Sequence, residues 1–176
     1  MSYNGRTNNL TGNKKSDEWY TPEFVVNKCY EIVEKEYNNP KILCPFDTDK
    51  SEFVKVGKNK NYSIQYNIEG DLQGDYDLIL TNPPFSVNSF EMFLQTGKDF
   101  IIVCPETFIF SVKFFNLYQK YNFHYKLYSP KQRVYFIDEN GKQNRPNFHT
   151  VIIAVSQKYE KNIIHHFLSG TRSDTE

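Results

Sequence analysis

The segment Asp75-Tyr76-Asp77-Leu78-Ile79-Leu80-Thr81-Asn82-Pro83-Pro84-Phe85 decides the fold. Its almost wholly apolar run, 77–80, is stopped by two prolines, which is typical of a strand buried on both faces of a sheet. This strand carries a polar side chain, a rigid turn and an aromatic ring to the edge at which it ends. Ligands of open α/β sheets bind at that carboxyl edge. We therefore expect Asn82 and its neighbours to lie in a binding site.

Helical and strand-like patterns alternate along the rest of the chain. Apolar residues at helical spacing follow Thr21-Pro22, which predicts a helix of about four turns with Thr21 as its N-cap. Strands separated by helices predict an α/β fold with a mostly parallel sheet. The other predicted elements are strands at 41–46, 62–67, 100–104, 125–128, 133–137 and 150–155, helices from Ser51 and at 110–121, and a turn at 138–141.

The length and the charge of the chain limit its organisation. At 176 residues it fits one domain, which we place at 17–169 between a flexible polar arm (1–16) and a flexible polar tail (170–176). Lysine plus arginine and aspartate plus glutamate both number 21, so the whole chain lacks the positive charge of many nucleic-acid binders. Contact with a polyanion therefore requires a local basic patch.

The cysteines and the hydropathy indicate the compartment. Cys29, Cys44 and Cys104 lie far apart in apolar runs, which favours buried thiols over disulfides or a zinc cluster. The four histidines match no metal-ligand spacing, so we expect no metal. No apolar run approaches the roughly 18 residues of a membrane span, and the N-terminus lacks the apolar core of a signal peptide. We expect a cytoplasmic protein without a membrane partner.

The tetrapeptide Asn82-Pro83-Pro84-Phe85 suits chemistry on an aromatic amine. The lone pair of such an amine is conjugated with its ring, so acceptors must hold its hydrogens and favour a pyramidal nitrogen. Asn82 Oδ1 and the Pro83 carbonyl are two such acceptors, the prolines fix them in place, and Phe85 offers a face for an extruded base. The alternative is a stiff turn after a buried strand.

This tetrapeptide resembles the catalytic motif of S-adenosylmethionine-dependent methyltransferases that act on amino groups, in the form usual for N6-adenine DNA enzymes. The resemblance implies a Rossmann-like class I fold with helices on both faces of the sheet and an antiparallel C-terminal strand. It also implies S-adenosyl-L-methionine as cofactor, adenine in DNA as substrate and all four residues as catalytic. Enzymes that methylate RNA adenine, guanine N2 of ribosomal RNA or a protein glutamine amide remain alternatives, because they share the motif or a close variant.

Two further stretches extend the resemblance over about residues 17–156. Asp17-Glu18-Trp19-Tyr20-Thr21-Pro22 resembles the segment before the first helix of phage and bacterial adenine methyltransferases. The resemblance implies that Thr21 and the helix start help to hold the methionine carboxylate of the cofactor, and that Trp19 and Tyr20 also bind the cofactor. A plain helix cap is the alternative. Pro45-Phe46-Asp47 stands where the family usually has a glycine-rich cofactor loop, and it resembles a divergent phage-borne branch. A solvated acidic turn is the alternative for this loop.

The family also places acids after the second strand and near the next one. Asn67 stands at the first position, and Asp71 suits the second, which implies a contact with the cofactor adenine. Asp71 is equally suited to a turn after Gly70. No segment is identified as the family's third strand, so we expect an abbreviated sheet.

The segment 108–150 is the candidate substrate surface. It holds seven basic residues against two acidic ones and is rich in aromatic residues, a combination that suits nucleic acid, whereas a solvated face is the alternative. Within it, 133–150 is expected to lie across the substrate. Sequence specificity is then low, lies in this segment, or comes from a separate partner. A catalytically inactive nucleic-acid-binding relative is the competing class. The residues predicted to bind substrate are Lys131, Arg133, Lys142 and Arg145.

Overall fold

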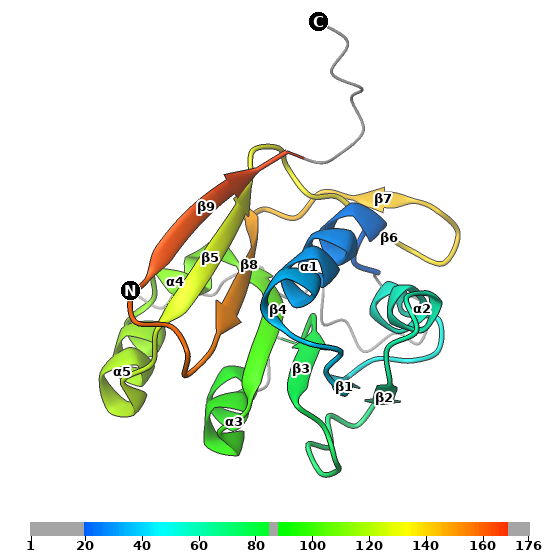
Figure 1. Ribbon diagram of the computed structural model, residues 1–176. Helices are drawn as coiled ribbons and strands as arrows, with labels where there is room; N and C mark the ends of the chain where they lie inside the picture. Colours follow the sequence, from blue (N-terminus) through cyan, green and yellow to red (C-terminus); the bar gives the residue numbers. More distant parts are fainter. Residues whose placement is uncertain (1–19, 85–87, 169–176) are drawn as a thin grey trace, which may run out of the picture.

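The computed structural model describes residues 20–84 and 88–168. A seven-stranded sheet lies between two layers of helices, and a small hairpin, β6–β7, lies beyond one end of α1 (Figure 1). In chain order the elements are α1 (Glu23–Glu36), β1 (Ile42–Pro45), α2 (Glu52–Asn59), β2 (Ile64–Asn67), β3 (Leu78–Thr81), α3 (Ser89–Thr96), β4 (Asp99–Pro105), α4 (Glu106–Ile109), α5 (Val112–Tyr121), β5 (Tyr125–Pro130), β6 (Phe136–Ile137), β7 (Gln143–Asn144), β8 (Thr150–Val155) and β9 (Ile163–Phe167).

The sheet has the strand order β2-β1-β3-β4-β8-β5-β9. Strands β2, β1, β3 and β4 are mutually parallel, β8 is antiparallel to β4 and β5, and β9 is parallel to β5. The prediction of a mostly parallel α/β sheet with an antiparallel strand near the C-terminus is confirmed. Within the described residues β2 and β9 are the two outer strands.

Alternate residues of the buried strands face the two helical layers. Leu78 and Leu80 of β3 pack under α1 and α2, whereas Ile79 packs with Phe90 and Phe93 of α3 and with the apolar face of α5. All four residues of β3 are buried, and the predicted buried strand at 77–80 is confirmed for 78–80, whereas Asp77 is exposed. Burial of each large apolar side chain stabilises the fold by about 1.5–3 kcal/mol. The three cysteines are buried and free, which confirms their prediction as core thiols.

Three sequence predictions differ from the structure. The helix expected at 110–121 is α5, which begins at Val112 because the Ser111 hydroxyl caps it by accepting from the Phe114 amide at 3.1 Å, and the short helix α4 before it was not predicted. Thr21 is not a helix cap, because Pro22 occupies the N-cap position of α1. The turn at 138–141 leads into β7 rather than into β8. Strand β9 was not predicted.

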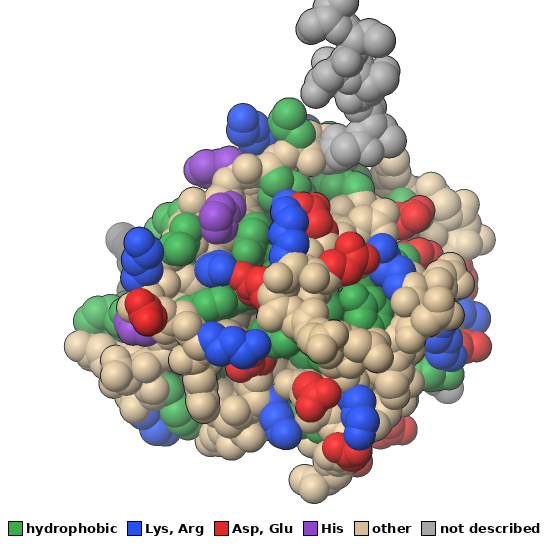
Figure 2. Space-filling model, viewed as in Figure 1, with side chains coloured by type: hydrophobic (Ala, Val, Ile, Leu, Met, Phe, Trp, Pro, Cys, Tyr) green, Lys and Arg blue, Asp and Glu red, His purple; other side chains and the backbone are tan. Residues whose placement is uncertain are grey.

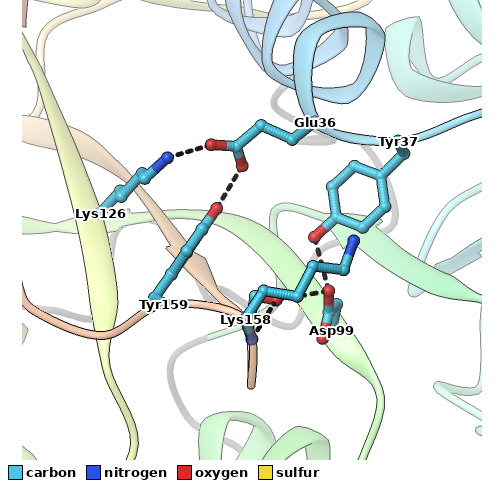
Figure 3. Close-up of polar contacts among 7 residues, drawn as sticks. Glu36, Tyr37, Asp99, Lys126, Lys158 and Tyr159 are labelled. Carbon is cyan, nitrogen blue, oxygen red and sulfur yellow. Dashed lines mark hydrogen bonds and ion pairs between the residues drawn. The ribbon is translucent and has the colours of Figure 1, made fainter.

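A polar network fastens α1 at the amino edge of the sheet, where β3, β4 and β5 begin (Figure 3). The Glu36 carboxylate accepts from Lys126 of β5 and from the Tyr159 hydroxyl. The Tyr37 and Ser156 hydroxyls both donate to Asp99 Oδ2, at 2.8 and 2.7 Å. Four separate segments of the chain are thereby joined.

Within 20–84 and 88–168, none of the helices has the length and apolar character that a membrane span requires.

Candidate active site

Strand β3 delivers the tetrapeptide to the carboxyl edge of the sheet. Thr81, its last residue, is fully buried and pairs in register with Ile102 of β4. Asn82 is half-buried, Pro83 is buried and Pro84 is half-buried, whereas Phe85 lies outside the described residues. The backbone after Thr81 therefore leaves the sheet beside the last residues of β4.

The Asn82 side chain contacts the segment before α1. Asn82 Nδ2 donates to Thr21 Oγ1 at 3.0 Å, and Thr21 is only 7% exposed. With Nδ2 engaged in this way, the second polar atom of the amide, Oδ1, remains as an acceptor. Two motifs 61 positions apart are thus brought together. Trp19, which was predicted with Thr21, lies outside the described residues.

The hairpin β6–β7 is attached to the same place. The Tyr20 amide donates to the Ile137 carbonyl at 2.7 Å, and the Ile137 amide donates to the Tyr20 carbonyl at 3.2 Å. This antiparallel bridge holds the hairpin against the start of α1, next to the residue that contacts Asn82. The candidate substrate segment therefore reaches the carboxyl edge through a backbone contact that no local sequence pattern predicts.

Asp47 joins the loop after β1 to the tetrapeptide. The Ser51 hydroxyl donates to Asp47 Oδ1 at 2.6 Å, and Thr81 Oγ1 lies 2.7 Å from Asp47 Oδ2 and 2.6 Å from the Pro45 carbonyl oxygen. Burial raises the pKa of Asp47 to about 6. A hydroxyl has one hydrogen, so both contacts of Thr81 are satisfied when protonated Asp47 donates to Thr81 and Thr81 donates to Pro45.

The loop after β1 contains a residue other than glycine in a backbone conformation that is typical of glycine. Phe46 has φ +66°, in the left-handed region that glycine adopts most easily. Its ring covers Gly70, where an added Cβ would lie 2.1 Å from Phe46 Cε1. A side chain at position 70 therefore requires the Phe46 ring to move, so the two residues form one unit at the ends of β1 and β2.

Asp71 lies on an exposed turn beside a cleft. The Asn67 side chain bonds the Asp71 amide and carbonyl at 2.8 and 2.9 Å, and Asp71 Oδ1 accepts from the Gln73 amide at 3.0 Å. Asp71 also lines an open cleft of about 560 Å³, together with Tyr76 and residues of α3. Asp71 therefore has both predicted features: one of its carboxylate oxygens stabilises the turn, and the residue also lines the cleft.

The basic residues of the segment 108–150 fall into two groups. Lys120 and Lys126 form ion pairs with Glu91 and Glu36. Lys113, Lys131, Lys142 and Arg145 are exposed and Arg133 is half-buried, and within 20–84 and 88–168 none of these five forms an ion pair. On the face that carries α1 and α2, basic and acidic side chains are interspersed (Figure 2).

Sequence reasoning missed two features of this edge. No role was predicted for Thr81, although its hydroxyl links Asp47 to the strand that carries the tetrapeptide; a threonine directly before a polar turn is a weak signal for such a link. The exposure of Phe110 and Phe115 was also missed, because a helix predicted across both residues hides the turn that presents them.

Comparison with known proteins identifies the fold. No family model and no curated protein sequence matches the chain. A protein from Listeria monocytogenes assigned to the class I S-adenosylmethionine-dependent methyltransferases is similar in structure, with a TM-score of 0.53, 9% identity and 84% of this chain covered. This chain spans only 65% of the length of that protein. A protein from Pyrococcus horikoshii assigned as an RNA methyltransferase has a TM-score of 0.50 and 12% identity, with 82% of this chain and 90% of that protein covered. The chain has the Rossmann-like fold of class I methyltransferases.

Proposed function

We propose that this protein transfers a methyl group from S-adenosyl-L-methionine to the N6 amine of adenine in DNA. The contact between Asn82 and Thr21 carries this proposal. It fixes the side-chain amide of the tetrapeptide at the carboxyl edge of the sheet, where α/β proteins bind ligands, and leaves Oδ1 as an acceptor.

The tetrapeptide acts on the amine by holding its two hydrogens. Asn82 Oδ1 and the Pro83 carbonyl accept them, which favours a pyramidal nitrogen with its lone pair free for attack. The bond from Thr21 fixes the Asn82 amide before the base arrives, and the contacts of Thr81 fix the backbone one residue earlier. Most of the rate enhancement then comes from positioning. Phe85 provides the face on which the flipped base stacks.

The residues at this edge fit the proposed cofactor. Among the described residues no side chain caps α1, so the N–H groups of Glu23 and Phe24 are available to a carboxylate beside Tyr20 and Thr21. Pro45, Phe46 and Asp47 form the loop at the end of β1, and Asp71 follows the end of the neighbouring strand β2, where it suits the adenine of the cofactor. S-adenosyl-L-methionine, when bound, supplies an electrophilic methyl group on sulfur.

We call residues 131–145, which include the hairpin β6–β7, the hairpin region. The positive charge of this region supports a nucleic-acid substrate over a protein substrate. Lys131, Arg133, Lys142 and Arg145 form no ion pairs among the described residues, and phosphates are the partners that such groups bind. The resemblance of the tetrapeptide favours adenine in DNA. Sequence selectivity then lies in this hairpin region or comes from a separate partner.

Identification of the methylated nucleoside tests the proposal. The protein is incubated with methyl-labelled S-adenosyl-L-methionine and, in parallel, with unmethylated DNA or total RNA, and the products are digested to nucleosides. We expect label in N6-methyldeoxyadenosine, and we expect it to disappear in Asn82→Ala.

Each other outcome identifies a different function. Label in RNA adenine or in guanine N2 contradicts the DNA assignment and retains the chemistry. A folded protein that binds DNA but labels no base, and gives no calorimetric heat with S-adenosylhomocysteine, is an inactive nucleic-acid-binding relative.

A further inference from the structure

The turn between α4 and α5 presents apolar side chains to solvent. Phe110 is 81% exposed, Val112 76% and Phe115 56%, although Phe114 on the same helix is buried. The amphipathic pattern of α5 therefore has apolar residues on its outer face, where polar residues are expected. We call Phe110, Val112 and Phe115 the outer aromatic patch.

This patch has a fixed backbone. The Ser111 hydroxyl donates to the Phe108 carbonyl at 2.6 Å and accepts from the Phe114 amide at 3.1 Å. The Phe108 ring packs against Phe114 and Phe90, with centroids 5.5 and 5.2 Å away. These contacts anchor the turn in the core, so Phe110 is exposed by a well-packed structure rather than by a loose loop.

The patch lies at the same edge of the sheet as the tetrapeptide. Thr81 pairs with Ile102, so β4 reaches its end at Pro105 beside the chain that follows β3, and α4 begins directly at Glu106. Phe90, which contacts Phe108, belongs to α3, the helix that follows the tetrapeptide along the chain. The chain that leads to the outer aromatic patch thus leaves the sheet one strand away from the chain that carries Asn82.

An unpaired lysine lies within the patch sequence. Lys113, between Val112 and the buried Phe114, is exposed and forms no ion pair among the described residues, whereas Lys120 on the same helix pairs with Glu91. Aromatic rings beside an unpaired lysine suit a polyanion that carries flat apolar rings.

We infer that the outer aromatic patch stacks unpaired bases of single-stranded nucleic acid next to the target adenine, so that the protein prefers single strands to duplex. This inference rests on the proposed function and names its substrate class. Bases within a duplex already stack on their neighbours, so their faces are closed to Phe110 and Phe115. Unpaired bases offer both faces, and such stacking tolerates any sequence.

Binding to short labelled DNA tests the inference in the absence of cofactor. Fluorescence anisotropy compares an adenine-containing single strand with its duplex, for the wild type and for Phe110→Leu/Phe115→Leu. Leucine keeps the apolar character and removes the ring. We expect the single-strand affinity to fall roughly tenfold or more and the duplex affinity to stay within about twofold. Phe110→Trp should retain binding, and its added fluorescence should be quenched by the single strand.

The control is Ile164→Ala/Leu168→Ala. It removes apolar side chains that are 60% and 65% exposed, in and directly after the outer strand β9. It should bind both DNAs as the wild type does. Unchanged single-strand binding by the leucine variant, or equal losses for both DNAs, overturns the inference. The nucleoside assay is a separate readout. If the leucine variant loses single-strand affinity but the wild type transfers no methyl group, only the proposed function is contradicted. If the wild type transfers methyl groups and the leucine variant binds single strands normally, only the role of the patch is contradicted.

Discussion

The two edges of the central sheet use charge in opposite ways. At the amino edge, Glu36 is bonded to Lys126 and Tyr159, and Lys158 lies 4.3 Å from the centre of the Tyr37 ring. At the carboxyl edge, Lys131, Lys142 and Arg145 form no ion pairs among the described residues. Charges that are satisfied within the protein hold segments together, whereas charges left open are available to a ligand. We therefore expect changes at the amino edge to affect stability, and changes at the carboxyl edge to affect binding and catalysis.

The largest expected effect is at Asn82. Asn82→Ala removes one of two proposed acceptors, and loss of one such group typically lowers kcat by roughly 100- to 1,000-fold. Steady-state kinetics of methyl transfer measure the effect, and calorimetry with S-adenosylhomocysteine should show cofactor binding close to that of the wild type. Asn88→Ala is the matched control, because it removes the same side chain from an exposed residue whose side chain bonds only to Glu91 among the described residues. Equal activity of the two variants would exclude Asn82 from catalysis.

The second effect is on the affinity for nucleic acid. Replacing Lys131, Lys142 and Arg145 by alanine should weaken DNA binding by roughly 10- to 100-fold at moderate salt and reduce the salt dependence of log K by about 2–3, because each phosphate contact contributes about 0.9 to the slope. Binding titrations at several salt concentrations measure both quantities.

The matched control replaces three lysines that form exposed ion pairs, with the same loss of charge. We choose Lys35, Lys55 and Lys60, which pair with Glu31, Glu52 and Glu34. Their replacement should change the slope little. Equal losses in the two triple variants would mean that net charge, rather than the hairpin region, governs binding.

Much of the fold was predictable because its signals are local. The apolar run of β3 ending in two prolines, the Ser51 cap of α2 and the apolar strand β8 are each encoded in a few adjacent residues. Strand β9 was missed because three of its five residues are exposed and two of those are histidines, so no apolar run marks it. An edge strand is specified mainly by its pairing with a distant neighbour, here β5.

The candidate site was predictable as motifs but not as contacts. The tetrapeptide and Thr21 were both identified, yet their hydrogen bond joins positions far apart in the chain. The expectation that Thr21 caps α1 was wrong, because Pro22 holds the cap position and the Thr21 hydroxyl accepts from Asn82 instead. Links such as Tyr20 to Ile137 depend on how the chain returns across the sheet, which local patterns do not specify.

The third effect is on stability at the amino edge. Glu36→Ala leaves Lys126 and the Tyr159 hydroxyl, both half-buried, without their shared acceptor, so we expect a loss of about 2 kcal/mol in the free energy of unfolding. Urea denaturation measures this loss. Glu34→Ala breaks a solvent-exposed pair with Lys60 and should cost about 0.5 kcal/mol or less. At a temperature where the wild type, Glu36→Ala and Glu34→Ala are all folded, their rates of methyl transfer should be equal. A loss of activity in Glu36→Ala alone would contradict the expectation that changes at the amino edge affect stability and not catalysis.

The smallest effect concerns Asp47, a carboxyl-edge residue whose contacts are all internal. Burial raises its pKa to about 6, above an unfolded value of about 3.9, so between these pH values the folded state binds more protons than the unfolded state. Stability therefore falls as the pH rises through this window, by about 1 kcal/mol between pH 5 and pH 7. Asp47→Asn, which cannot ionise, should lack this fall in stability.

The difference between wild type and Asp47→Asn isolates that residue. Carboxylates with lowered pKa values, such as Glu31 and Asp75, contribute the opposite slope at lower pH in both proteins and cancel in the difference. We expect the variant to gain stability relative to the wild type from pH 5 to pH 7 in urea titrations. Parallel pH profiles would mean that Asp47 is ionised in the fold at pH 5. Thr81 would then have to share its single hydrogen between Asp47 and the Pro45 carbonyl, and the link that supports Asn82 would rest on a weaker bond.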